Sequence, residues 1–155
     1  MVGRSKFLAV FYHENAPLRD GTQKIGYMLL DGECGTVITK GSTSSISQSS
    51  MLVWTGFTND GSLISMDGEG LVAMLADVSS PSADSSQAQW EWIPMLDTMI
   101  HKKSVDDTFW PISAFDGKLV CVPLKGGTKF PDASRRPVTT TLSFRMPLAG
   151  GMSKR

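Results

Sequence analysis

The sequence predicts an all-β fold of short antiparallel meanders, and two similar stretches of chain support that prediction. Residues 51–75 predict three apolar strands, the first two joined by a tight turn at Asp60-Gly61. Residues 109–124 repeat the arrangement around Asp116-Gly117. Glycine, asparagine and aspartate favour hairpin turns because they tolerate positive φ. The chain shows no convincing long amphipathic helix, so about nine or ten strands are expected.

The two Asp-Gly turns indicate a weak internal repeat. Each is preceded by a phenylalanine and followed, two positions after its glycine, by Leu63 or Leu119. Their separation is near the roughly 40 to 50 residues of a β-propeller blade, stretched by a polar insert. Independent hairpins of a β-sandwich would give the same pattern, so spacing alone leaves both folds open. A three-strand meander cannot bury both faces by itself and must form one layer of something larger.

The rest of the chain fits the same fold class. Further strands are expected at 7–12, 23–31, 36–40, 90–96 and 138–148, with a brief helical turn at 95–100. The second of these strands alternates as a half-buried strand should, with Ile25, Tyr27 and Leu29 on one face. The first strand has almost nothing before it, which suggests that the chain is a segment of a larger propeller.

Three polar stretches are expected to lie outside the sheets. Residues 41–50 and 78–89 are Ser-rich, too polar to pack, and predict flexible connectors. Residues 149–155 predict a frayed tail. The serines of the connectors are open to phosphorylation, which would add about −1.5 to −2 charges per site.

Length and composition favour one soluble intracellular domain. The 155 residues suffice for a sizeable core, and 15 basic side chains balance 15 acidic ones, which argues against a strongly basic nucleic-acid binder. No apolar run approaches the roughly 18 residues that span a bilayer, and the first residues lack the apolar centre of a secretory signal. Two cysteines far apart favour a reducing compartment over a disulfide framework.

Residues capable of metal binding or nucleophilic catalysis are scattered. The classical transition-metal donors are His13, His101, Cys34 and Cys121, and no two of them share a ligand spacing. The simpler interpretation is two buried or half-buried thiols and two loop histidines. No serine lies in a nucleophile motif, and most lie in the connectors, where a catalytic group could not be held rigidly. No metal or cofactor is therefore expected.

Several carboxylates stand at or beside the predicted turns: Asp60, Asp67, Glu69 and Asp116. A glycosidase would need two acids about 5 to 10 Å apart across its substrate, which sequence cannot show. The turn 58–61 faintly resembles the Asp-box of sialidase-type propellers, but it lacks the tryptophan that follows in that box. Hairpin chemistry explains its aspartate and glycine fully, so a protein without enzymatic activity is expected.

Residues 125–129, Lys-Gly-Gly-Thr-Lys, could be mistaken for a phosphate-binding loop. No helix pattern follows them, so their N–H groups have no reason to converge on an anion. Together with Arg135 and Arg136 they form a basic patch, which could contact a nucleic-acid backbone or an acidic partner, or simply be a solvated loop. The four tryptophans are expected mainly in the core, and one or two on the surface would mark an interface.

A run of short motifs, ordered along the chain, resembles a known family. In the central meander the matching segments are Trp54–Phe57, Asp60–Gly61 and Asp67–Leu75. After the Ser-rich insert they continue as Trp92–Pro94, Phe109–Pro111, Leu119–Pro123, Lys125–Gly127, Lys129–Pro131, Arg136–Pro137 and Leu142–Leu148. Residues 7–30 are similar more weakly. The family is that of replisome adaptors, which includes the fungal SepB protein, the minichromosome loss protein and the vertebrate acidic nucleoplasmic DNA-binding protein.

The resemblance implies that residues 1–148 are a partial six-bladed SepB-type β-propeller of about three blades, the last half of the ring. Members of the family act in the nucleus and form a homotrimer through this domain. Their trimer links the replicative helicase to DNA polymerase α as a scaffold without catalytic activity, with roles in chromatin binding and sister chromatid cohesion. They also carry a WD40 propeller and a helical domain that takes up partner peptides, both outside this stretch.

Candidate partner or trimer contacts are Phe130, Arg135 and Arg136, because they lie together on a long loop and an interface depends on a few aromatic or arginine anchors. Two other functions stay open beside the scaffold. One is a direct DNA-binding module, and the other is a propeller hydrolase of the sialidase or lactonase type.

Overall fold

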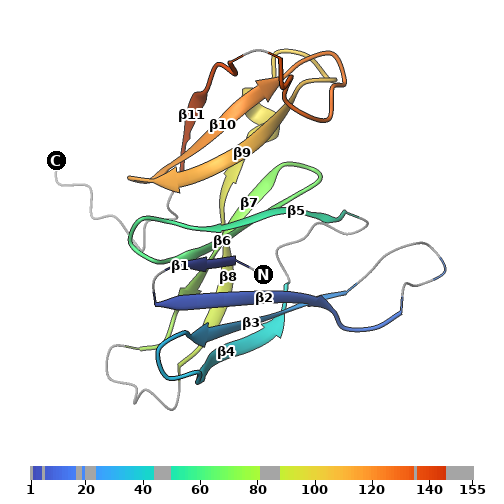
Figure 1. Ribbon diagram of the computed structural model, residues 1–155. Helices are drawn as coiled ribbons and strands as arrows, with labels where there is room; N and C mark the ends of the chain where they lie inside the picture. The colour runs from blue at the N-terminus through green and yellow to red at the C-terminus, as the bar shows by residue number, and fades with distance from the viewer. Residues whose placement is uncertain are drawn as a thin grey trace, which may run out of the picture.

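The computed structural model describes residues 2–4, 6–16, 19, 24–43, 50–80, 88–134 and 136–145. Within these residues, eleven strands form three antiparallel sheets, which confirms the predicted all-β class (Figure 1). A 3-10 helix of one turn, Thr98–His101, is the only helix of the described residues. None of their helices is long and apolar enough to cross a membrane.

Each sheet is a meander in which successive strands are hydrogen-bonded neighbours. Sheet A contains β1 (Val2–Arg4), β2 (Phe7–His13), β3 (Ile25–Asp31) and β4 (Val37–Ser42). Sheet B contains β5 (Leu52–Phe57), β6 (Leu63–Asp67), β7 (Leu71–Asp77) and β8 (Trp90–Asp97). Sheet C contains β9 (Thr108–Phe115), β10 (Lys118–Leu124) and β11 (Thr140–Ser143).

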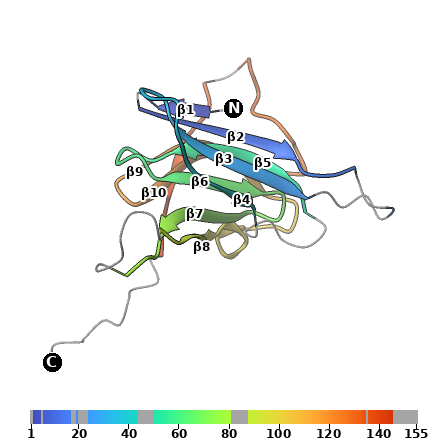
Figure 2. The same ribbon diagram turned by 90° about the horizontal axis from the view of Figure 1, so that it is seen from below.

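The three sheets succeed one another as blades of a propeller. The first strands of neighbouring sheets lie together, β1 beside β5 and β5 beside β9 (Figure 1). The later strands of each sheet extend away from this edge, as the view from below also shows (Figure 2). First strands gathered around one line with the sheets fanned out from it are typical of propeller blades. The chain is therefore a partial β-propeller of three blades, and the count of six for the whole ring stays a prediction.

A hydrophobic cluster fills the space between sheets A and B. Its buried members are Ala9, Tyr27 and Leu29 from sheet A and Leu63, Ala73, Leu75 and Trp92 from sheet B. The Tyr27 ring meets the Trp92 ring edge-on, with the centroids 5.3 Å apart. The predicted alternation of β3 places the buried Tyr27 and Leu29 on this face. Full burial of one apolar side chain contributes about 1.5–3 kcal/mol, so this cluster binds the two blades firmly.

A second cluster joins sheets B and C. Its buried members are Met66, Val72, Leu96, Leu119, Cys121 and Leu142, and Trp54, Phe109 and Phe144 pack against it. Sheet B thus contributes one face to each cluster, which explains why all five residues of β6 are buried. The backbone of Arg145 also donates to the carbonyl of Met95, which ties the end of sheet C to β8.

Four sequence predictions differ in detail from the structure. β1 was not expected, and it forms by pairing its backbone with β2. The expected connector 41–50 begins too early, because Gly41 and Ser42 belong to β4. Residues 44–49, like 81–87 and 146–155, lie outside the described residues.

The helical turn and the last strand are the other two differences. The turn occupies 98–101 rather than 95–100, because Met95 and Leu96 still belong to β8. A β-bulge at Met95 lets both of these consecutive side chains be buried. The sequence therefore lacks the alternation of apolar and polar residues that would have indicated a strand here. The strand expected at 138–148 is β11, which covers only Thr140–Ser143.

Candidate interaction surface

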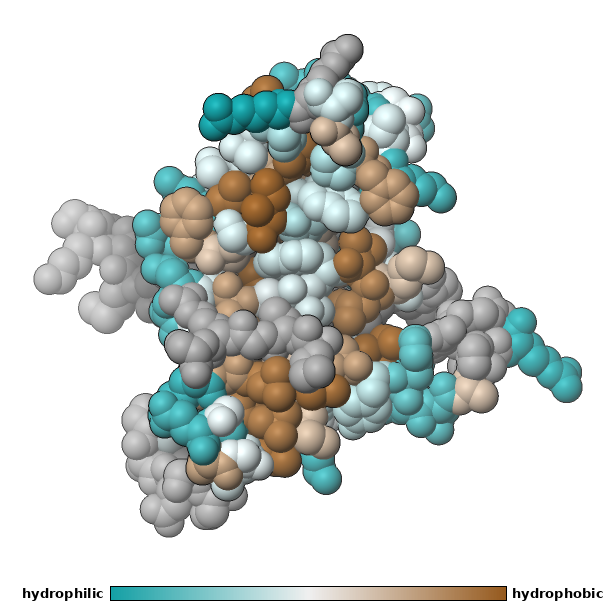
Figure 3. All heavy atoms as spheres, viewed as in Figure 1, coloured by the Kyte–Doolittle hydropathy of each residue, from teal (hydrophilic) through white to brown (hydrophobic). Residues whose placement is uncertain are grey.

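The outer face of sheet C, the side turned away from sheet B, exposes large apolar side chains. Strand β9 contributes Trp110, Ile112 and Phe115, which are 36%, 48% and 44% exposed. Phe130, on the loop between β10 and β11, is 68% exposed and meets Trp110 edge-on with ring centroids 5.5 Å apart. We call these four residues the outer patch of sheet C. Figure 3 shows hydrophobic atoms gathered over β9 in the same region.

The register of the sheets explains why Trp110 faces outward. In sheet B, Trp54 pairs with Met66, and both belong to the cluster that faces sheet C. In sheet C, Trp110 pairs with Val122. Val122 has the same separation along its strand from Leu119 as Met66 has from Leu63, and both leucines face the preceding sheet. Trp110 therefore occupies in sheet C the position that Trp54 occupies in sheet B. It points to where a further sheet would pack.

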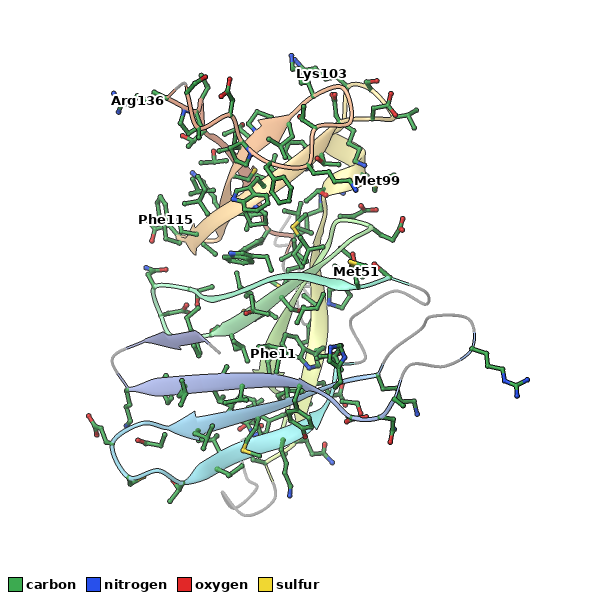
Figure 4. The ribbon with its side chains drawn as sticks, turned by 45° about the vertical axis from the view of Figure 1, so that its right-hand side comes forward. Phe11, Met51, Met99, Lys103, Phe115 and Arg136 are labelled. Atoms are coloured by element: carbon green, nitrogen blue, oxygen red, sulfur yellow. The ribbon has the colours of Figure 1, made fainter. Side chains whose placement is uncertain are left out.

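Basic residues surround the loop that carries Phe130. Lys125, Lys129 and Arg136 are exposed, whereas Arg135 lies outside the described residues. Figure 4 shows Arg136 and Lys103 extending from the loops beyond sheet C. The structure thus places two of the three predicted contact residues on one exposed loop.

The segment 125–129 does not form an anion-binding loop. The Gly127 N–H donates to the backbone carbonyl of Asp106, 3.1 Å away, and the Thr128 N–H lies 3.3 Å from the carbonyl of Lys125. These N–H groups are used within the protein rather than aimed together at a ligand. The first of these bonds holds the loop before β9 against the loop after β10, so it supports the outer patch.

The turn carboxylates serve the turns, as the hairpin interpretation predicted. Asp60 accepts from the hydroxyl of Thr58, and this bond holds the pKa of Asp60 below its usual value. Asp67 is buried and accepts from the Leu71 N–H at 2.9 Å. Asp116 accepts from the side-chain amide of Asn59 at 3.2 Å. Each hydrogen bond belongs to a turn or joins two turns, so these acids have a structural role.

Within the described residues, no group of three His, Cys, Asp or Glu side chains could hold a metal ion. Cys121 is buried between sheets B and C, and burial raises the pKa of its thiol to about 11. Cys34 was expected to be at least half-buried, but it is exposed in the turn after β3. His13 ends β2 and His101 ends the 3-10 helix, so neither lies in a loop as expected.

Comparison with known proteins decides the family. The family model described as "Minichromosome loss protein, Mcl1, middle region" matches residues 1–148. The chain belongs to this family. The match agrees with the expected resemblance to replisome adaptors, and it covers all eleven described strands.

Three relatives illustrate the breadth of the minichromosome loss protein family. The human "WD repeat and HMG-box DNA-binding protein 1" is 31% identical over 150 residues, which is 95% of this chain and 12% of the relative. The Arabidopsis thaliana "Protein ENHANCER OF LHP1 1" is 29% identical over 96% of this chain and 14% of its own length. "Minichromosome loss protein 1" of Schizosaccharomyces pombe is 27% identical over 83% of this chain and 15% of its own. The chain therefore spans about one-eighth of the length of these relatives.

Sequence reasoning identified Phe130 and Arg136 but missed the β9 part of the outer patch. Trp110 was assigned mainly to the core, like the other tryptophans, and it is 36% exposed instead. The repeat itself held the signal, because aligning the two Asp-Gly turns places Trp110 opposite Trp54 in the last blade. Within the described residues, no sheet packs over that position.

Proposed function

We propose that this chain is a non-catalytic protein-interaction module of the DNA replication fork. Within the nucleus it serves a homotrimeric hub that links the replicative helicase to DNA polymerase α. The observation that carries this proposal is the family match over residues 1–148. The names of the relatives, which refer to minichromosome loss and to a DNA-binding protein, support a role in chromosome replication.

The outer patch of sheet C and its basic loop supply the proposed contact surface. Protein interfaces combine a few buried aromatic or arginine anchors with a polar rim that excludes water. Trp110 and Phe130 provide adjoining rings, and Arg136 lies on the same loop as Phe130. A partner with apolar anchors and an acidic flank is the complement of this surface. Arg135 is proposed to act beside Arg136, as the sequence suggested.

The experiment measures binding of the chain to purified replicative helicase and to purified DNA polymerase α. Phe130→Ala is compared with Val105→Ala, which removes an exposed apolar side chain from a neighbouring loop. The double variant Arg135→Glu/Arg136→Glu is compared with Lys24→Glu/Lys40→Glu, which changes two exposed lysines at sheet A, away from this loop. We expect the first member of each pair to weaken binding at least tenfold, about 1.4 kcal/mol, and the control to change it little.

Circular dichroism of every variant checks that the sheets remain folded. Equal affinity of Phe130→Ala, of the Arg double variant and of wild type would show that this loop is not the contact surface. Absence of binding to both enzymes by wild type would reject the linking role. Strong binding to duplex DNA, with log affinity falling steeply with log salt, would favour the DNA-binding alternative.

A further inference from the structure

A groove of about 470 Å³ lies between sheets A and B, at the side where β2 begins and β7 ends. The segments that form it gather on the left of the two sheets in Figure 1. Its floor is apolar, because it includes Leu29, Leu63 and Leu75 from the cluster between the two sheets. Phe7 of sheet A and Trp90 of sheet B add two aromatic rings to its lining. Binding sites are typically concave and mostly apolar, with a few polar groups that fix the ligand.

The polar groups that line this groove include two carboxylates, Asp60 and Asp77. Asp60 lies in the turn between β5 and β6, and Asp77 is the last residue of β7. Ile64 pairs with Met74 in antiparallel register, so the turn before β6 lies beside the end of β7. Asp77 in turn pairs with Trp90 of β8. The two acids therefore share one end of sheet B, and both are exposed.

Both carboxylates are ionised at neutral pH. The Thr58 hydroxyl donates to Asp60, which holds the pKa of that carboxyl below its ordinary value. The Ser79 hydroxyl and N–H both donate to Asp77 and lower the pKa of this second carboxyl in the same way. These hydrogen bonds fix the orientation of each carboxylate without cancelling its charge.

The groove has no counterion of its own. Among the residues that the structure describes, no lysine, arginine or histidine lines it. Lys6 lies near one wall, with its Nζ atom 5.9 Å from the centroid of the Phe7 ring, but it is paired with Asp31 at 3.8 Å. An apolar groove with two uncompensated negative charges is complementary to a ligand that combines an aliphatic part with a positive charge.

We propose that this groove binds a lysine side chain of a partner protein, with its aliphatic stem on the leucine floor and its ammonium group beside Asp60 and Asp77. Lysine buries its stem along apolar surface and keeps its charged end near water, which matches a buried floor below two exposed acids. Phe7 and Trp90 can add cation–π attraction. This inference concerns the groove between sheets A and B and does not depend on the replication role.

The carboxylates favour lysine over arginine. Arginine is selected where a planar guanidinium forms two parallel hydrogen bonds to one carboxylate. Here Asp60 already accepts from Thr58 and, at 3.4 Å, from the Ser62 hydroxyl, so both of its oxygens are engaged. The ammonium group is a compact charge with three rotatable donors, and it needs only one accessible lone pair on each acid.

The test titrates the isotopically labelled chain with a terminally blocked peptide, Gly-Ala-Lys-Ala-Gly, and follows its amide signals by NMR. A second peptide carries norleucine in place of lysine, which keeps the stem without the charge. A third carries diaminopropionic acid, which keeps the charge on a short stem. We expect the lysine peptide to give saturable shifts at residues 60–63 and 75–77. The norleucine peptide should bind at least about tenfold more weakly, and the short-stem peptide should also bind more weakly.

A pair of matched variants tests the role of the charge. Asp77→Asn removes one charge of the groove and nearly keeps the side-chain shape. Asp132→Asn is the control in sheet C, because Asp132 accepts from the N–H and hydroxyl of Ser134 as Asp77 does from Ser79. We expect Asp77→Asn to weaken binding of the lysine peptide at least about threefold and to leave the norleucine peptide unaffected. Asp132→Asn should change neither.

Three outcomes would overturn the proposal. Equal affinity for the lysine and norleucine peptides would show that the groove recognises apolar surface alone. Shifts spread over sheet C, or an equal loss in Asp77→Asn and Asp132→Asn, would show unspecific attraction by charge. The third is the absence of shifts at about 5 mM lysine peptide, because a single side chain held in this way should bind in the millimolar range or better.

Circular dichroism confirms that each variant is folded. Should Asp77→Asn not fold, Asp60→Asn takes its place under the same criteria. The comparison of the three peptides uses wild type alone, so it decides between charge and apolar contact whatever the variants do.

Discussion

Trp54 and Trp110 hold matching positions in neighbouring blades, but only one of them is covered. Trp54 packs against the cluster between sheets B and C, whereas Trp110 is more exposed and contacts Phe130. Residue type and strand register are the same for both, so the difference comes from the presence or absence of a following sheet. Sheet B is stabilised by packing on both of its faces, whereas no sheet of the described residues packs on the outer face of sheet C.

The hairpin turns show the same contrast. In central sheet B, Gly61 lies against the Phe7 ring of sheet A, with 3.3 Å from an added Cβ to the nearest ring atom. The adjoining Asn59 bonds to Asp116 of sheet C. In sheet C, an added Cβ on Gly117 would meet nothing within 4 Å. The central turn therefore touches both neighbouring blades, while the turn of the end blade is open on one side.

The largest expected effect is the difference in unfolding free energy lost when each of the two tryptophans is replaced by alanine. Trp54→Ala should lower the free energy of unfolding by about 3 kcal/mol, because it leaves a cavity beside the cluster between sheets B and C. Trp110→Ala should cost less than about 1 kcal/mol, because the residue is 36% exposed and no sheet of the described residues packs over it. Urea titration at concentrations where the chain is unassociated measures both. Equal losses would mean that the outer face of sheet C is as well packed as an internal interface.

The next largest difference is in the stability lost when each of two turn glycines is replaced by alanine. Gly70 of sheet B has φ +89°, and a Cβ there would lie 2.1 Å from the Thr98 hydroxyl oxygen. Gly117 of sheet C has φ +69° and open space around it. Gly117→Ala should cost about 1 kcal/mol from backbone strain alone. Gly70→Ala should cost at least about 2 kcal/mol, since it adds a steric clash with the 3-10 helix. Thermal unfolding of both variants measures the difference, and a larger loss for Gly117→Ala would contradict it.

A smaller effect is expected for the link between the turns of sheets B and C. Asn59 donates through its amide to the Asp116 carboxylate and accepts from the Asp116 N–H, both at 3.2 Å. The site is exposed, so Asn59→Ala should cost about 0.5–1 kcal/mol. Asn15→Ala, in the loop after β2, is the matched control and should cost almost nothing. If both variants unfold at the same urea concentration as wild type, the link does not stabilise the contact between the blades.

The sequence was sufficient to predict most of this fold, because local turn chemistry and strand alternation agree. Asp60-Gly61 and Asp116-Gly117 mark hairpins that the structure contains, and β6 has the predicted bounds. β1 could not be predicted, since its three residues carry no apolar pattern and depend on the backbone of β2. The bulge at Met95 likewise follows from its pairing with β7, a contact distant in sequence.

The candidate surface was less predictable than the fold. Phe130 and Arg136 were identified because a loop of that length and composition is exposed in any arrangement of the strands. The exposure of Trp110 and Phe115 depends on which blade is last in the row, and residue type does not encode that order. Aligning the two Asp-Gly turns places Trp110 opposite Trp54, and the register of β9 against β10, compared with β5 against β6, then shows that this face is uncovered among the described sheets.

The smallest expected effect concerns pH and the central turn. The Thr58 hydroxyl donates to Asp60, which lowers the pKa of that carboxyl below its ordinary value of 3.8. A carboxylate whose pKa is lower in the folded than in the unfolded chain stabilises the fold above the unfolded value and ceases to do so as pH falls through the folded value. Asp60→Asn should therefore destabilise the chain at pH 7 by less than about 1 kcal/mol, since the group is mostly exposed.

This difference between wild type and Asp60→Asn should shrink as pH drops below 3.8, the range in which the folded carboxylate takes up its proton. Thr58→Ser keeps the donating hydroxyl and should preserve the pH profile, whereas Thr58→Val removes it and should flatten the profile. Urea titrations at a series of pH values measure all four proteins. A difference that stays constant down to pH 2 would mean that Asp60 stabilises the turn through its shape alone. The charge of Asp60 would then contribute nothing to the contact of this turn with both neighbouring blades.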